Sequence, residues 1–138
     1  MGKGVIYDQE MMGLINLLSR ITHARIKDCF KEEDTLYCIV EKGDIGKAIG
    51  KEGINIKKLC QLTNKKIRMV EFGETAIKMV KNFIYPLVSE EIKEEDGAVK
   101  IIGADKKTKS LLIGRDGKNL KLINKAVNRF YDIEIKVI

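Results

Sequence analysis

Hydrophobic residues recur along this chain with two alternating periods. Within 8–21 they follow the three-to-four-residue spacing of an amphipathic helix, and Asp8 stands where such a helix needs a capping side chain. Segments 24–30 and 35–41 are apolar runs of strand length, joined by the polar sequence KEED. The N-terminal part of the chain therefore predicts a helix followed by a β-hairpin.

The rest of the chain continues this order and then repeats it. The patterns predict, in sequence, helices over 44–49 and 54–63, a strand over 66–72, a helix over 75–85, strands over 88–93 and 98–102, helices over 105–113 and 118–129, and a strand over 132–138. In the last segment apolar and charged residues alternate from Ile133 to Val137, which is the two-residue period of a strand. We therefore expect an α+β fold in which the order α-β-β-α-α-β occurs twice.

The repetition extends to the sequence itself. The segment AIGKEGINIKKL at 48–59 matches LIGRDGKNLKLI at 112–123 with an offset of 64 residues, and the tripeptide EED precedes a strand-like run in both halves. Because the match covers nearly the whole chain, a duplication explains it better than a chance pair of motifs. We expect domains at 1–73 and 74–138. Domains of this size bury little surface alone, so we also expect the two to pack together.

Positive charge is concentrated in two parts of the chain. The net charge is +6 at neutral pH, yet segments 44–68 and 105–129 carry +5 and +6, so the remaining residues together carry −5. Two lysine-rich, solvent-facing helices would explain this distribution on their own. The same clustering is the electrostatic footprint of a protein that binds a polyanion.

Composition disfavours several classes of protein. No run of 18 apolar residues is present and the N-terminus MGKGVIYDQEMMGL lacks a signal-peptide core, so we expect a cytoplasmic protein without membrane attachment. Cys29, Cys38 and Cys60 form no CxxC pair and are expected to be reduced, partly buried residues. The single histidine, His23, is expected at a helix end or on the surface. No metal site and no cofactor are predicted.

The repeated glycines carry the clearest chemical signal. In 50–53 and 114–117, glycine can end a helix because it tolerates a positive φ, and it lacks the Cβ that would keep a ligand away from the peptide N–H groups. The following helix adds free N–H groups and the positive end of its dipole, which suits phosphate. A Walker A loop is excluded because Glu52 follows Lys51 where Ser or Thr is required, and no Rossmann GxGxxG is present.

Around IGKEG and IGRDG, with a helix on each side and a strand before them, the chain resembles the K-homology (KH) family of RNA-binding domains. A helix and two strands precede each motif, and only 21 residues follow Gly117, which matches the type II order. Over 5–138 the chain resembles the archaeal NusA-like transcription termination and antitermination factors. The resemblance implies two tandem type II KH domains, each with a three-stranded sheet and helices packed on one face. Each GXXG loop would clamp about four nucleotides of single-stranded RNA.

The resemblance further implies a non-catalytic monomer that binds single-stranded RNA, with the RNA polymerase elongation complex as a second candidate partner. Lys51 and Arg115 would meet phosphates, and bases would be selected by hydrogen bonds in an aliphatic groove, because the chain has no Trp and only four Phe and four Tyr. The residues implicated in RNA binding are Ile49, Gly50, Lys51, Glu52, Gly53, Ile54, Asn55, Lys57, Lys58, Ile113, Gly114, Arg115, Asp116, Gly117, Lys118, Asn119 and Lys121, with Ile56 and Leu120 completing the apolar floor.

Some interpretations stay open at this point. Glu52 and Asp116 place an acid beside each loop's base, which predicts modest affinity per domain and one composite groove for roughly eight nucleotides. Asn55 and Asn119 could contact RNA or cap a helix. The alternatives for the whole protein are a KH protein of ribosome assembly or RNA processing, a nucleotide-using enzyme, and a protein–protein module in which one copy has lost RNA binding.

Overall fold

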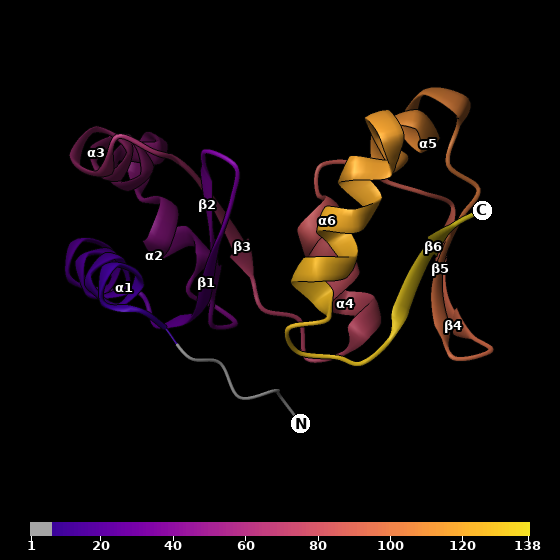
Figure 1. The fold of residues 1–138 in the computed structure, drawn as a ribbon, viewed down its shortest axis with the longest axis horizontal. Coiled ribbons are helices and arrows are strands. Elements are labelled where there is room, and N and C mark those ends of the chain that lie inside the picture. The colour runs from indigo at the N-terminus through magenta and orange to yellow at the C-terminus, as the bar shows by residue number, and fades with distance from the viewer. Residues whose placement is uncertain (1–6) are drawn as a thin grey trace. The chain divides into compact units, whose positions relative to one another are not determined.

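The computed structural model describes residues 7–138. The expectations that concern the N-terminal residues, including the start of the resemblance at residue 5, lie outside this range. The described residues form two compact units that meet in the sequence between Phe72 and Gly73 (Figure 1). We call the part that ends at Phe72 the first unit, and Gly73–Ile138 the second unit.

Both units have the element order that the sequence predicts. The first contains α1 (Gln9–Thr22), β1 (Ile26–Glu32), β2 (Thr35–Val40), α2 (Ile45–Ile49), the 3-10 turn η1 (Lys51–Gly53), α3 (Ile54–Thr63) and β3 (Lys66–Glu71). The second contains α4 (Ala76–Ile84), β4 (Glu91–Glu95), β5 (Ala98–Ile102), α5 (Lys106–Ile113), η2 (Arg115–Gly117), α6 (Lys118–Val127) and β6 (Glu134–Val137). Among the described residues, no helix is both long enough and apolar enough to cross a bilayer.

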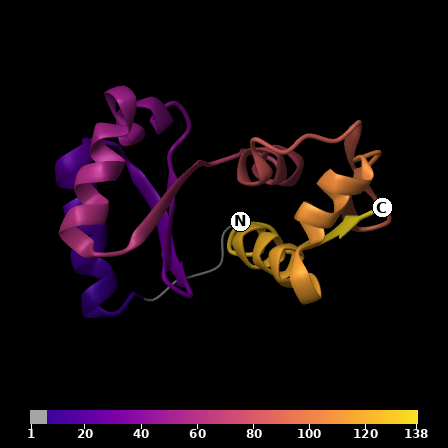
Figure 2. The same ribbon diagram turned by 90° about the horizontal axis from the view of Figure 1, so that it is seen from above.

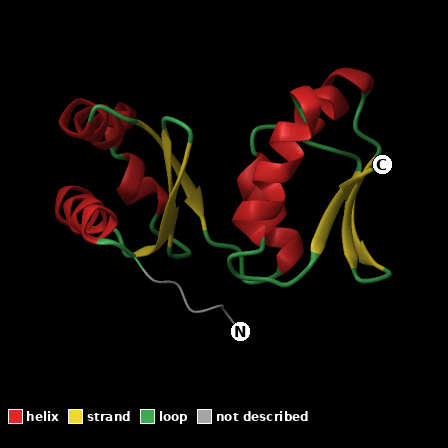
Figure 3. Cartoon of the chain, in the orientation of Figure 1, coloured by secondary structure: helices red, strands yellow, loops and turns green. Residues whose placement is uncertain are grey.

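Each unit contains one three-stranded sheet with the same topology. In the first unit β2 is central, antiparallel to β1 and parallel to β3. In the second unit β5 takes the same place between β4 and β6. The three helices of the first unit lie on one face of its sheet (Figures 1 and 2), and those of the second unit lie on one face of theirs (Figure 3). This is the predicted type II arrangement, and it occurs twice.

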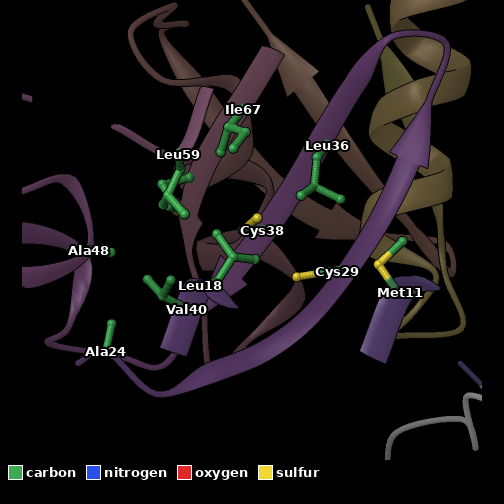
Figure 4. Close-up of a cluster of buried hydrophobic side chains, with 11 residues drawn as sticks. Met11, Leu18, Ala24, Cys29, Leu36, Cys38, Val40, Ala48, Leu59 and Ile67 are labelled. Atoms are coloured by element: carbon green, nitrogen blue, oxygen red, sulfur yellow. The ribbon is translucent and has the colours of Figure 1, made fainter. Parts of the chain in front are cut away.

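The core of the first unit fixes the helices that flank its glycine loop. Side chains of β2 alternate, so that Leu36, Cys38 and Val40 point towards the helices (Figure 4). Ala48 of α2 and Leu59 of α3 are both completely buried in this cluster. In the second unit Leu112 of α5 and Ile123 of α6 are buried in the same way, together with Val99, Ile101 and Ile135 of its sheet. Burial of these side chains positions each helix pair against a sheet.

Helix ends follow the local sequence at most positions. Asp8 accepts a hydrogen bond from the Met11 N–H at 2.7 Å, and Asp105 accepts one from the Thr108 N–H at the same distance. His23 ends α1 with a left-handed φ of 59° and is exposed, as predicted. Cys29 and Cys38 are buried, and all three cysteines are free thiols.

Several predicted boundaries are wrong by two or three residues. The first strand was expected over 24–30 but runs Ile26–Glu32, and the strand expected over 88–93 runs Glu91–Glu95. Both hairpins turn on only two residues, with φ of 55° at Glu33 and of 54° at Asp96, so that the polar residues before each turn continue the strand.

The second unit also ends differently from the prediction. The helix expected over 118–129 stops at Val127, and the strand expected over 132–138 is limited to Glu134–Val137. The reason is a turn held by Asn128, whose side-chain amide donates to the Asn124 and Ile133 carbonyls at 2.8 Å each.

Candidate nucleic-acid interface

Each unit presents one four-residue loop between two helices. We call residues 50–53 loop 1 and residues 114–117 loop 2. The two backbones are nearly identical: φ and ψ are 78° and 166° at Gly50, and 76° and 170° at Gly114. The third residue is left-handed in both, with φ of 57° at Glu52 and 56° at Asp116. The same local geometry is therefore built twice.

The two glycines of each loop are required for different reasons. A Cβ on Gly50 would lie 2.9 Å from the Asn55 side chain, and one on Gly114 would lie 2.7 Å from the Asn119 backbone nitrogen. At Gly53 and Gly117 nothing lies within 4 Å of that position, although φ is positive in both. The first glycine therefore permits a close internal contact, and only the second leaves open space where a ligand could approach.

The loops leave two peptide N–H groups available at their centres. In loop 1 the Gly53 N–H donates to the Gly50 carbonyl at 3.1 Å, and the Ile54 N–H donates to the Lys51 carbonyl. Within residues 7–138, the N–H groups of Lys51 and Glu52 have no hydrogen-bond partner. Loop 2 has the same internal bonds and leaves the N–H groups of Arg115 and Asp116 available. Adjacent N–H groups of this kind form a concave site for an anion.

Most of the predicted charged residues are exposed at these loops. Lys51, Lys57 and Lys58 are exposed in the first unit, as are Arg115, Lys118 and Lys121 in the second. Among the described residues, neither Lys51 nor Arg115 takes part in an ion pair, whereas Lys118 does have an interaction partner. The neighbouring acids, Glu52 and Asp116, are also exposed and do not neutralise these two cations.

The predicted apolar floor is only partly in place beside each loop. Ile49 and Ile56 are half-buried, while Ile54 is 61% exposed and forms the surface at the start of α3. In the second unit Ile113 and Leu120 are half-buried, and the residue at the position of Ile54 is Lys118. An exposed apolar residue is present instead at Leu111, which is 51% exposed and lies outside the predicted set of RNA-binding residues.

Asn55 and Asn119 do not cap the helices in which they lie. Neither α3 nor α6 has a side-chain capping hydrogen bond at its N-terminus. The Asn55 amide instead donates to the Lys47 carbonyl in α2 at 3.0 Å. The Asn119 amide donates to the Leu111 and Leu112 carbonyls in α5, at 3.1 Å each. Each asparagine thus completes the C-terminal end of the preceding helix.

An ion pair that the sequence did not reveal anchors the start of α2. Arg25 donates to the Asp44 carboxylate from its backbone N–H at 2.8 Å and from Nε at 3.0 Å. These hydrogen bonds lower the pKa of Asp44 to about 2. Asp44 was expected to begin this helix, and it occupies the capping position without making a capping hydrogen bond, because its oxygens are held by Arg25.

Comparison with known proteins identifies the family. A protein of Methanocaldococcus jannaschii, named "Probable transcription termination protein NusA", is 30% identical to this chain over 142 aligned residues, which cover 100% of the chain and 77% of that protein. This chain belongs to the archaeal NusA family. A NusA relative from Methanococcus vannielii, which has the same name, is 30% identical to this chain over 109 residues. The match covers 77% of this chain and 63% of the length of that relative.

Two further similarities place the NusA-family features on this structure. The family model described as "NusA-like second KH domain" matches residues 14–77, a range that contains all of loop 1. The crystal structure of APE1850 is 28% identical to this chain with a TM-score of 0.75, and the match covers 96% of this chain and 99% of that one. The two units are therefore tandem type II KH domains of a NusA-family chain.

Proposed function

We propose that this NusA-family chain binds single-stranded RNA through loops 1 and 2 and acts in transcription termination or antitermination. The observation that carries the proposal is the double occurrence of one arrangement. Each loop combines two available N–H groups, a glycine with open space in front of it, and an exposed cation that is in no ion pair within the described residues.

The sugar–phosphate backbone is the part of RNA that this arrangement suits. A phosphate oxygen would accept hydrogen bonds from the N–H groups of Lys51 and Glu52, with the Lys51 ammonium beside it; loop 2 would act in the same way through Arg115 and Asp116. These contacts carry no sequence information. Bases would be selected at the neighbouring aliphatic side chains, such as Ile54, because no Trp is present in the chain.

Two linked domains would compensate for weak individual ones. The exposed carboxylates of Glu52 and Asp116 oppose the approach of phosphate, so each loop alone should bind RNA modestly. Binding of one loop raises the effective concentration of RNA at the other, because both belong to one chain. A protein that binds nascent RNA in this way would act next to the RNA polymerase elongation complex, without catalysing a reaction itself.

Charge reversal at the loops tests the proposal. We expect Lys51→Asp and Arg115→Asp each to weaken binding to labelled single-stranded RNA 8-mers by about tenfold, the loss typical of one charge-assisted hydrogen bond. The double variant should lose more affinity. The slope of its log affinity against log salt concentration should decrease in magnitude by at least about 1.4. Lys78→Asp is the matched control, because Lys78 is an exposed lysine of α4, outside both loops.

The outcome separates loop binding from general electrostatic attraction. If Lys78→Asp weakens binding as much as the loop variants do, only net charge matters and the proposed site is wrong. If the correctly folded double variant binds RNA like the wild type, RNA binding by these loops is excluded.

A further inference from the structure

The asparagine five residues after the first loop glycine joins the two helices of the pair in both units. Asn55 follows Gly50 and Asn119 follows Gly114 at this spacing. Each lies in the second helix of its pair and donates hydrogen bonds to carbonyls of the first helix, across the loop. In each unit one of these hydrogen bonds joins residues that are eight positions apart in the sequence, and the whole loop lies between them.

The carbonyls that these asparagines bind have no partner inside their own helix. The Gly50 N–H, at the start of loop 1, donates to the Gly46 carbonyl at 2.9 Å, and the Gly114 N–H, at the start of loop 2, donates to the Ser110 carbonyl at 2.8 Å. These are the last carbonyls of α2 and α5 that accept a backbone hydrogen bond of the helical pattern. The carbonyls that follow them are the unsatisfied groups of a helix end. Asn55 satisfies that of Lys47, and Asn119 satisfies the two that follow Ser110.

The first glycine of each loop and the asparagine fit each other. Any side chain at Gly50 would overlap the Asn55 amide, since a Cβ there would lie 2.9 Å from both Cγ and Nδ2. At Gly114 the overlap is with the Asn119 backbone nitrogen and Cβ, at 2.7 and 2.8 Å. This contact sets where the chain leaves the first helix and where it enters the second.

We infer that Asn55 and Asn119 are positioning residues for the two nucleic-acid-binding loops. Each fixes the direction of the two central N–H groups by holding the helix ends on either side of them, and neither needs to touch RNA. The inference rests on the proposed function and adds to it the element that gives the loop its shape. Asn119 makes two such hydrogen bonds and Asn55 makes one, so loop 2 depends on its asparagine more strongly.

Alanine substitution tests this role without changing any charge. We expect Asn55→Ala to weaken binding of single-stranded RNA 8-mers by about fivefold, as for one lost hydrogen bond, and Asn119→Ala to weaken it further. The salt slope of log affinity should fall by about 0.7 for each loop that loses a phosphate contact. A variant that only unfolds part of the protein would leave this slope unchanged in the folded fraction.

Asn124→Ala is the matched control. Asn124 braces α6 to β6, since its amide exchanges hydrogen bonds with both the N–H and the carbonyl of Ile135, at 2.8 and 3.1 Å. This variant should lower the thermal unfolding midpoint and leave RNA affinity and salt slope at wild-type values. If Asn55→Ala does not fold, Asn55→Gln keeps the amide, displaces it by one methylene, and should give a smaller change in the same direction.

The possible results separate the inference from the function on which it rests. If wild type binds RNA and both loop asparagine variants retain its affinity and slope, the positioning role is wrong while RNA binding stands. If Asn124→Ala weakens binding as much as they do, the loss reflects general destabilisation and the positioning role is again wrong. If wild type binds no RNA 8-mer at any salt concentration, the proposed function fails, and the inference fails with it.

Discussion

Loops 1 and 2 have nearly the same backbone conformation, but the residues that flank them differ. In loop 1 the flanking helix positions hold Lys47 and Ile54, while the corresponding positions of loop 2 hold Leu111 and Lys118. The two apolar residues are 61% and 51% exposed, and both lysines are exposed as well. An apolar residue and a cation thus stand beside each loop, but on opposite helices of the pair.

This difference separates two parts of recognition. The N–H groups and glycines that suit phosphate are the same in both units, as expected for contacts that carry no sequence information. The exposed side chains next to them, which would meet the bases, differ. We therefore expect the two domains to hold the RNA backbone alike and to prefer different bases.

The largest effect on stability should come from substitution of the first glycine of each loop. The two units differ there in the atoms that an added Cβ would meet. Both glycines have φ and ψ in a region that other residues adopt at a cost of about 1–3 kcal/mol. Gly114→Ala should lower the free energy of unfolding more than Gly50→Ala, because its Cβ meets backbone rather than the end of a side chain. Urea denaturation of the single variants measures this difference.

A second substitution sharpens the same comparison. Asn55→Ala should partly restore the stability of Gly50→Ala by removing the overlapping amide. Asn119→Ala should not restore Gly114→Ala, because the Asn119 backbone nitrogen remains. Equal rescue in both units would show that the described contacts do not determine the cost.

Exchange of the flanking residues should change base preference. Ile54→Lys and Lys118→Ile each convert one loop towards the other, and we expect relative affinities within a panel of RNA 8-mers to change by about fivefold, the effect of losing or gaining one partly buried aliphatic contact. Leu62→Lys is the control, since Leu62 is 57% exposed near the C-terminal end of α3. A panel ranking that is unchanged by the exchange would remove the assigned role of these positions.

The start of α2 should be sensitive to acid. Asp44 has a folded pKa of about 2 against an ordinary 3.8, so its contribution to stability is present above about pH 4 and is lost as the pH falls towards 2. Asp44→Asn should lower the unfolding temperature of the first unit at pH 6 and reduce its loss between pH 4 and 2. Thermal melts across this range test the prediction; a mutant curve parallel to the wild type would contradict it.

The smallest effect concerns the acid in each loop. Asn adopts left-handed φ more readily than Glu and carries no charge, so Glu52→Asn should keep the loop shape and remove repulsion from phosphate. We expect RNA affinity to rise by roughly twofold, or about 0.5 kcal/mol, as for one exposed charge. Asp116→Asn should do the same in loop 2. A decrease in affinity would mean that the carboxylates contribute contacts to RNA.

The sequence predicted the parts of the fold that depend on local patterns. The order of elements, the duplication, the cap at Asp8 and the two glycine turns each follow from residues close together in the chain. Strand ends were less accurate because a two-residue turn, with Glu33 left-handed, lets the polar segment continue the strands.

Several of the features that were missed join a side chain to a distant backbone group. Arg25 and Asp44 are 19 residues apart, and Asp44 resembled an ordinary helix cap. For Asn55 and Asn119 the sequence left RNA contact and capping of their own helices open, and nothing in it shows that each amide crosses to the preceding helix. Such contacts depend on how the helices are placed, which a periodic pattern does not define.

Amide chemical shifts measure the central claim most directly. In a ¹H–¹⁵N correlation experiment on the full chain, titration with a single-stranded RNA 8-mer should shift the Lys51, Glu52, Arg115 and Asp116 amides most strongly, because their N–H groups are those available to phosphate. The amide of Lys78 should stay in place. If RNA saturates the protein while the four loop amides do not shift, the loops are not the binding site.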